Sequence, residues 1–210
     1  MLATASIIAL PGMGATAEMH SRIGSLLPNF KSVEWPDITG CNDFTDLAMR
    51  CIDLYDIKQS HVLVGSSMGG MVASEIAKIL GNQDLILIGS CLSSKSIRFG
   101  SLAEFGSRIM SDNLIKLIGS KGSISMLSRM IKQVDPKFIR WSLDRIGKWK
   151  GVNATELKKV HSIHGMIDPI IPITRVSPNM IIATGGHFIA ISHPKTVSKF
   201  IEFSLKNRSC

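Results

Sequence analysis

Short apolar runs alternate along this chain with segments in which apolar residues recur every three to four positions. Runs such as 7–10, 62–64 and 85–88 contain no polar residue, which is typical of strands that are buried on both faces. Segments 42–55 and 68–80 place their apolar residues at helical spacing. Strands that alternate with helices in this way predict a sheet covered by helices on both faces.

The pattern predicts the α/β fold class, with a mostly parallel sheet of about six strands. The expected strands are 3–10, 32–35, 61–65, 85–89, 160–164 and 179–184. The expected helices are 17–27, 42–55, 68–80 and 194–205. Thr16 is the candidate N-cap of the first helix, and Gly81 is expected to end the third.

Residues 95–150 break this alternation. They give amphipathic helical segments without a convincing strand, and several glycines and Pro136 interrupt them. A chain of 210 residues fits one domain with a single core and one large insertion. We therefore predict that 1–94 and 151–210 form the core and that 95–150 form a small helical cap inserted over the strand ends.

The run GSSMGG at 65–70 fits the pattern G-x-S-x-G and stands between a predicted strand and a predicted helix, as this motif requires. A sharp turn between strand and helix lifts the serine side chain away from the backbone, and the flanking glycines relieve crowding. The amides at the start of the helix point to where an oxyanion would form. Ser67 is therefore the candidate nucleophile, although the bare pattern would also fit an ordinary tight turn.

Two further residues complete a triad in the chain order Ser, acid, His. Asp168 follows the predicted strand 160–164, and His187, nineteen residues later, follows the next predicted strand. The carboxyl ends of parallel strands meet at one edge of the sheet, so all three side chains should lie there. An aspartate bonded to one ring nitrogen lets the other take the serine proton. We predict that His187 is the base and that Asp168 orients it.

An oxyanion hole needs two backbone N–H donors. One is expected from Met68, which follows the nucleophile, and the other from the loop 11–14, where Met13 is the candidate. Glycines in that loop would let the backbone approach a substrate closely. The residues expected to bind substrate are Gly12, Gly14, His20 and Trp141.

With these residues in place, the chain resembles the α/β-hydrolase superfamily over nearly its whole length. The resemblance rests on LPGMG for the oxyanion loop, HVLVGSSMGG for the nucleophile turn, HGMIDPIIP for the acid loop and GGHF for the histidine. Pro11 stands where many members of the superfamily have a histidine. Among its members, the compact bacterial carboxylesterases are similar, including those that demethylate methyl esters bound to acyl carrier protein.

The resemblance implies acyl chemistry through a covalent acyl-enzyme, without a cofactor. We expect a serine esterase that hydrolyses a carboxylic ester, with a carrier-bound acyl methyl ester as one candidate substrate. A thioesterase or acyltransferase acting on acyl-CoA or acyl carrier protein would keep the same triad. A non-catalytic binding protein of this fold could keep it too, because the fold alone does not fix the function.

Charge is unevenly distributed along the chain. Residues 1–90 carry a net charge of −4 and residues 91–210 carry +12, of which 95–150 contribute +8. A basic face on the cap would aid solubility, or it would steer an acidic carrier protein or an anionic substrate to the site; both interpretations stay open. No nucleic-acid-binding motif accompanies the charge, so nucleic acid is not an expected partner.

Composition indicates a globular protein, with 45% hydrophobic and 19% charged residues. No apolar run approaches the roughly 20 residues that a membrane-spanning helix needs, and the first ten residues do not resemble a signal peptide. We therefore expect a cytoplasmic protein without a membrane-spanning segment, and contact of the amphipathic cap helices with a membrane surface stays open. The cysteines and histidines have no metal-ligand spacing, so we expect free thiols and no metal site.

Overall fold

The computed structural model describes residues 6–81, 84–100, 102–103 and 135–206. In this part of the chain, six strands form one sheet in the order β2-β1-β3-β4-β5-β6. The strands are β1 (Ile7–Leu10), β2 (Phe30–Ser32), β3 (Val62–Ser66), β4 (Asp84–Ile88), β5 (Lys159–Gly165) and β6 (Met180–Ile182). All neighbouring pairs are parallel. The predicted α/β class with a parallel sheet of about six strands is confirmed.

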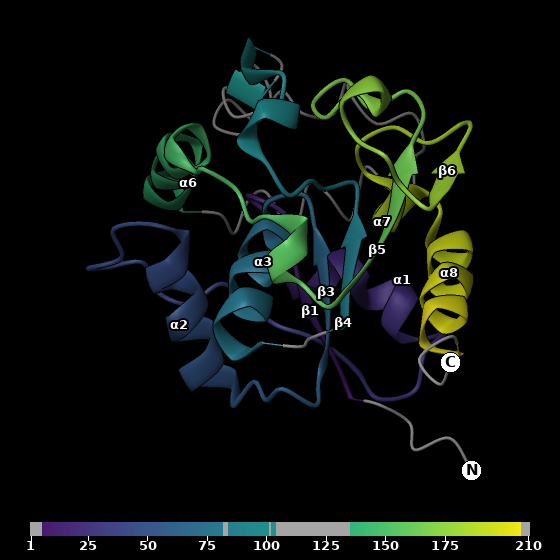
Figure 1. The fold of residues 1–210 in the computed structure, drawn as a ribbon, viewed down its shortest axis with the longest axis horizontal. Helices are drawn as coiled ribbons and strands as arrows, with labels where there is room; N and C mark the ends of the chain where they lie inside the picture. Colours follow the sequence, from purple (N-terminus) through teal and green to yellow (C-terminus); the bar gives the residue numbers. More distant parts are fainter. Residues whose placement is uncertain (1–5, 82–83, 101, 104–134, 207–210) are drawn as a thin grey trace.

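Helices cover both faces of the sheet (Figure 1). Helices α2 (Phe44–Tyr55) and α3 (Met68–Leu80) pack together on one face, and α1 (Ser21–Gly24) and α8 (Pro194–Lys206) pack together on the other. The other helices within the described residues are the α-helices α6 (Pro136–Lys148) and α7 (Ile189–Ser192) and the 3-10 helices η1 (Ala17–His20), η2 (Ser94–Ser96), η4 (Ala154–Glu156) and η5 (Ile173–Arg175).

The central strands are apolar on both faces because helices cover both. Every side chain of β1 is at most 3% exposed, and Leu63 and Val64 of β3 are fully buried. Truncating a leucine at such a position typically costs about 2–5 kcal/mol. These strands therefore form a rigid base for the loops that follow them.

The strand order reverses at β1 and β3, because β2 continues on one side of β1 while β3 lies on the other. Open parallel sheets bind their ligands at such a reversal, beyond the carboxyl ends of the strands. Leu10 pairs with Gly65, so the ends of β1 and β3 are level. This register places the loop after β1 beside the turn after β3.

Some elements differ in detail from the sequence prediction. The expected helix 17–27 is divided into η1 and α1, where burial of Met19 and His20 overrides helix propensity. Thr16 occupies the N-cap position of η1, but its side chain makes no capping hydrogen bond. Strand β2 also lies earlier than the expected 32–35. Gly81 ends α3 with φ 65°, as predicted.

The predicted cap lies only partly within the described residues. Of 95–150, the structure describes 95–100, 102–103 and 135–150, where η2 and α6 are helical. The other positions, including the basic residue Arg129, lie outside the described residues. The division into core and cap therefore stays a prediction.

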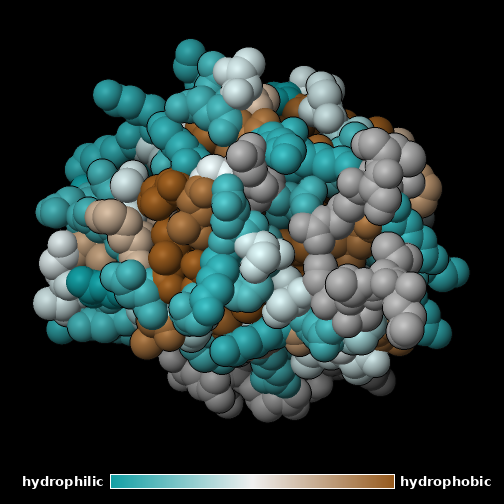
Figure 2. Space-filling model, turned by 60° about the horizontal axis from the view of Figure 1, so that its bottom comes forward, coloured by the Kyte–Doolittle hydropathy of each residue, from teal (hydrophilic) through white to brown (hydrophobic). Residues whose placement is uncertain are grey.

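The opposite end of the molecule, where the strands begin, is turned forward in Figure 2. A hydrophobic patch lies on the left of that view, the side that carries α2 and α3 in Figure 1. Exposed large apolar side chains of these two helices are Met49, Leu54 and Ile79.

Among the described residues, no helix is both long and apolar enough to cross a bilayer.

Candidate active site

Ser67 lies in the sharp turn between β3 and α3. Its backbone has φ 52° and ψ −122°, a conformation that side-chain-bearing residues rarely adopt and that costs about 1–3 kcal/mol. Ser90 Oγ donates a hydrogen bond to Ser67 O at 2.7 Å, which helps to hold this backbone in place. The strained turn presents the serine hydroxyl at the carboxyl edge of the sheet.

The glycines of the G-x-S-x-G motif allow this turn to pack tightly. A Cβ on Gly65 would overlap the backbone of Gly69 and Gly70. A Cβ on Gly69 would overlap the carbonyl oxygens of Leu10 and Pro11, at the end of β1. The motif therefore requires glycine because strand, helix and neighbouring strand meet here without room for a side chain.

The three predicted triad residues lie in hydrogen-bond contact. His187 Nε2 is 2.9 Å from Ser67 Oγ, and His187 Nδ1 is 2.8 Å from Asp168 Oδ2. Asp168 and His187 are buried, and Ser67 is partly exposed. Since the carboxylate accepts from Nδ1–H, Nε2 faces the serine without a proton and can accept one.

Asp168 is held by four hydrogen-bond donors. Its Oδ1 accepts from the backbone N–H of Ile170 and of Ile171, at 2.8 and 2.9 Å. Its Oδ2 contacts His187 and also His164 Nε2, at 3.1 Å. Burial by itself would raise the pKa of Asp168, but the charge of His187 and these hydrogen bonds hold it well below its usual range. The carboxylate therefore stays ionised next to the imidazole.

The loops that carry Asp168 and His187 also pack through glycines. A Cβ on Gly165 would overlap the carbonyl oxygens of Gly185 and Gly186, and Ile167 N–H donates to Gly185 O at 3.0 Å. These contacts bring the two loops together although nineteen residues separate Asp168 from His187.

His20, expected to bind substrate, lies behind the nucleophile turn and is fully buried. Its Nδ1 is 3.0 Å from Ser32 Oγ, and its Nε2 is 2.8 Å from Ser66 Oγ. Both ring nitrogens are thus engaged by hydroxyl groups. This position indicates a supporting residue rather than part of the pocket surface.

The two expected oxyanion-hole residues come from the two segments that meet at Ser67, the start of α3 and the loop after β1. Met68 is the first residue of α3, where a backbone N–H has no acceptor within its own helix. Met13 lies in the loop after β1, and its N–H has no hydrogen-bond acceptor in the part of the chain that the structure describes. Gly12 brings this loop close to the nucleophile, since a Cβ built on it would be 3.6 Å from Ser67 Cβ. Their role as oxyanion donors stays a prediction.

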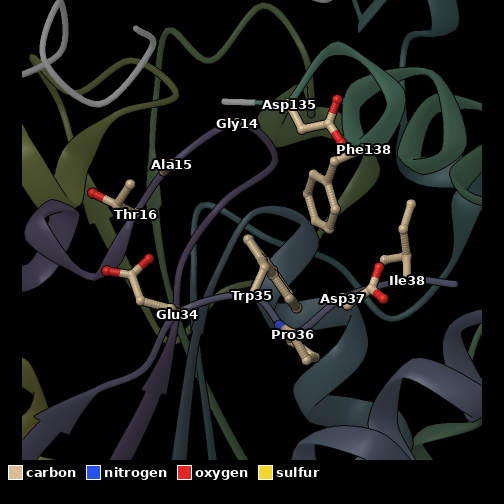
Figure 3. Close-up of a pocket in the computed structure, with 10 residues that line it drawn as sticks. All are labelled: Gly14, Ala15, Thr16, Glu34, Trp35, Pro36, Asp37, Ile38, Asp135 and Phe138. Carbon is tan, nitrogen blue, oxygen red and sulfur yellow. The ribbon is translucent and has the colours of Figure 1, made fainter. Parts of the chain in front are cut away.

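A cavity of about 240 Å³ lies beside the oxyanion loop (Figure 3). Its lining consists of Gly14, Ala15, Thr16, Glu34, Trp35, Pro36, Asp37, Ile38, Asp135 and Phe138. Trp35 and Phe138 face one another in it, with ring centroids 5.6 Å apart. Trp35 Nε1 also donates to Gly12 O at 3.2 Å, which connects this wall to the oxyanion loop. Among the described residues that line the cavity, all the charged ones are acidic.

Of the expected substrate-binding residues Gly14 and Trp141, only Gly14 belongs to the described lining of this cavity. Gly14 lines it with φ 71°. Trp141 on α6 instead donates its Nε1–H to Cys41 O at 3.0 Å and packs against Phe44 and Phe138. Substrate contact by Trp141 stays a prediction.

In the described part of the chain, the cysteines are free and no side-chain cluster could hold a metal ion. No group of three or more His, Cys, Asp or Glu side chains in them could hold a metal ion. Cys41, Cys51 and Cys91 are free and buried. Burial raises the pKa of both Cys51 and Cys91 to about 12, so these thiols are protonated at neutral pH.

Sequence reasoning gave no role to His164, Ser66 or Met19, although each contacts the site. His164 belongs to the HGMID segment, and its position four residues before Asp168 is the one sequence signal that points to a contact between the two. The contacts of Ser66 and Met19 with the site can be recognised only once the fold has placed the loop after β1 beside β3.

Comparison with solved structures relates this fold to α/β-hydrolases. A carboxylesterase from Nitrososphaera gargenis superposes with a TM-score of 0.76 at 15% identity, over 98% of this chain and 92% of its own. A hydrolase from Oleispira antarctica gives 0.75 at 11% identity, over 97% and 92%. A thermophilic esterase from Thermogutta terrifontis gives 0.71 at 16% identity, over 96% and 89%.

These likenesses show that the chain has the α/β-hydrolase fold. No protein-family model and no curated protein sequence matches it.

Proposed function

We propose that this protein is a serine hydrolase that cleaves a carboxylic ester through an acyl-enzyme intermediate. The observation that carries the proposal is the continuous contact from Ser67 Oγ through the imidazole of His187 to Asp168 Oδ2. A serine in a strained turn at a helix start, with a histidine on its hydroxyl, is the arrangement that nucleophilic catalysis requires. The esterases among the structures of the same fold support this class of reaction.

In the proposed acylation, Ser67 Oγ forms a bond to the ester carbonyl carbon while His187 Nε2 takes the hydroxyl proton. The electron pair of the carbonyl moves onto its oxygen, and the N–H groups of Met13 and Met68 are the proposed donors to that oxyanion. When the carbonyl re-forms, the bond to the alcohol oxygen breaks, and His187 returns the proton to the leaving alcohol.

In the proposed deacylation, a water molecule attacks the acyl carbon and gives a proton to His187 Nε2. The bond to Ser67 Oγ then breaks, the carboxylic acid leaves, and Ser67 recovers its proton. Asp168 stays ionised throughout, because its pKa lies well below the usual range. It keeps His187 in the required tautomer and stabilises the imidazolium that forms.

For the substrate, we propose a neutral ester in preference to an acyl-CoA thioester. The cavity beside the oxyanion loop carries three carboxylates, from Glu34, Asp37 and Asp135, and no basic side chain among its described lining. Like charges repel, so this wall disfavours the phosphates of coenzyme A. Its apolar part, Trp35 and Phe138, suits a small acyl or alkyl group.

The decisive experiment is labelling with a fluorophosphonate probe. Wild type should be labelled, and Ser67→Ala should lose both labelling and hydrolysis of p-nitrophenyl esters of increasing chain length. Ser25→Ala, which changes an exposed serine at the end of α1, is the matched control and should behave as wild type. Folded wild-type protein that is not labelled would overturn the proposal in favour of a binding protein.

A carrier-bound acyl methyl ester is the more specific candidate, with an acidic carrier protein on the basic side of the chain. On α6, Arg140 is exposed, and Arg145 lies 3.3 Å from Asp144 through its Nε. Charge reversal of Arg140 and Arg145 should then slow turnover of a carrier-bound ester at low salt and leave p-nitrophenyl acetate turnover unchanged. Equal carrier-ester turnover in the two proteins would exclude such a partner at this helix.

A further inference from the structure

Two consecutive residues of η1 contact the two segments that carry the proposed oxyanion donors. Met19 Sδ accepts a hydrogen bond at 3.3 Å from the N–H of Gly12, in the loop after β1. His20 Nε2 lies 2.8 Å from the Oγ of Ser66, immediately before the nucleophile. Met19 is 4% exposed and His20 is fully buried. One short helical turn therefore connects the loop to the nucleophile turn.

The hydrogen bonds of His20 define where its proton lies. The Ser32 hydroxyl donates to Ala9 O at 3.5 Å, so the Ser32 oxygen accepts from His20 Nδ1–H at 3.0 Å. Nε2 then has no proton and accepts from the hydroxyl of Ser66. Burial lowers the pKa of His20 to about 4, which keeps the ring neutral at neutral pH. The ring thus links β2 to the nucleophile turn in one orientation.

The loop and the turn also lie close together beside Met19. A Cβ built on Gly12 would lie 3.6 Å from both Ser66 O and Ser67 Cβ, and 3.8 Å from Met19 Cε. These are ordinary van der Waals distances for an added Cβ, so the space between the loop and the turn is about the size of one methyl group. If either contact of η1 is lost, one segment can shift against the other, and the distance between the two proposed N–H donors changes.

We propose that Met19 and His20 together set the spacing between the oxyanion loop and the nucleophile turn. This inference rests on the proposed function, and it assigns both as positioning residues that act through Gly12 and Ser66. Oxyanion donors must lie about 2.7–3.1 Å from the developing charge, and a displacement of about 1 Å can cost about a hundredfold in rate. Loss of the spacing should therefore lower kcat and leave KM nearly unchanged.

The kinetic test uses Met19→Leu, which removes the sulfur acceptor, and His20→Phe, which removes both ring nitrogens and keeps a ring. With rates normalised to fluorophosphonate-titrated sites, each should lower kcat for p-nitrophenyl acetate by about 10- to 100-fold. KM should change less than threefold, roughly, and the acid limb of the pH–rate profile should stay in place because the triad is intact. His161→Phe, a histidine at the far end of β5, is the matched control and should keep wild-type kcat.

A double-mutant cycle tests the contact between His20 and Ser66. If His20 acts through the Ser66 hydroxyl, Ser66→Ala and His20→Phe together should lower kcat no further than the larger single effect. The proposal would be overturned if the double variant lowered kcat by the product of the two single effects. It would also be overturned if Met19→Leu and His20→Phe both kept wild-type kcat.

A structural readout separates this inference from the proposed function. In a ¹H–¹⁵N spectrum, Met19→Leu and His20→Phe should each shift the amide resonances of Met13 and Met68, and His161→Phe should not. If the variants show these shifts but the wild type does not react with the fluorophosphonate, the proposed function is overturned and the positioning role is supported. Unshifted Met13 and Met68 amides would overturn the positioning role even in an active enzyme.

Discussion

Trp149 Nε1 donates a hydrogen bond to Glu75 Oε1 over 2.6 Å in the interior of the molecule. Glu75 is 7% exposed and lies on α3, the helix that begins directly after Ser67. Burial raises the pKa of Glu75, whereas the hydrogen bond from Trp149 and the charge of Lys78 lower it. A carboxyl with a raised pKa binds its proton more tightly in the folded state, so its contribution to stability is lost as pH rises.

We predict that Glu75→Gln stabilises the protein at alkaline pH. Glutamine keeps the acceptor for Trp149 and removes the buried charge, so the free energy of unfolding at pH 8 should rise by about 1 kcal/mol. The gain should shrink toward pH 4, where Glu75 of the wild type takes up a proton. Urea unfolding at both pH values measures this, with the exposed Glu202→Gln as control. A loss of the same size at both pH values would contradict the prediction.

Asp168 should make the fold sensitive to acid. Its pKa is held below the ordinary value of 3.8, so it stabilises the folded state above that value and this contribution disappears as pH falls below it. Asp168→Asn cannot lose a charge, and its free energy of unfolding should fall less steeply between pH 5 and pH 2 than that of wild type. If the free energies of unfolding of the two proteins fell in parallel with pH, Asp168 would have the same pKa in the folded and unfolded states, which would contradict the prediction.

His20 should give a second, separate pH dependence. Its pKa falls from 6.5 to about 4 on folding, so the unfolded chain binds the proton more tightly and stability is lost as pH falls through this range. The loss is on the order of 3 kcal/mol, given about 1.4 kcal/mol for each pH unit. His20→Phe should lack this part of the slope between pH 6.5 and pH 4. Chemical denaturation at several pH values in that interval compares the two slopes, and equal slopes would refute the assignment.

Gly65→Ala should destabilise the protein strongly. The added methyl group would overlap the backbone of Gly69 and Gly70, and neither strand β3 nor helix α3 can move without disturbing the core. We expect a loss of about 3 kcal/mol or more in the free energy of unfolding. Gly100→Ala is the matched control, because a Cβ there meets nothing within 4 Å, and its stability should stay near that of wild type. A wild-type unfolding midpoint for Gly65→Ala would show that the turn is looser than described.

The fold could be predicted from the sequence because its central strands are short runs of almost exclusively apolar residues. Residues 62–64 and 85–88 are apolar on both faces, and α3 begins and ends where the spacing and Gly81 predict. The candidate triad could be predicted because Ser67 directly follows β3, and Asp168 and His187 lie in the loops after β5 and β6, whose carboxyl ends share one edge of the sheet. Ser67 and Asp168 can be identified as candidates from their positions after predicted strands, without knowledge of side-chain contacts.

The supports of the site could not be predicted in the same way. His20 has helical neighbours in the sequence, and its fully buried position depends on Ser32 and Ser66, which are 12 and 46 residues away. His164 had no predicted role at the site, but its ring reaches Asp168 and also lies 2.8 Å from Ile171 O. Long-range contacts between polar side chains leave no periodic signal, so sequence patterning cannot reveal them.

The backbone of Ser67 has a consequence for how this chain can change. At φ 52°, glycine would fit the turn with less strain than serine does, so Ser67→Gly should give a more stable protein that carries no hydroxyl. Selection for stability alone would therefore favour replacing this serine. Its presence in an unfavourable conformation is what a chain under selection for the hydroxyl itself would retain.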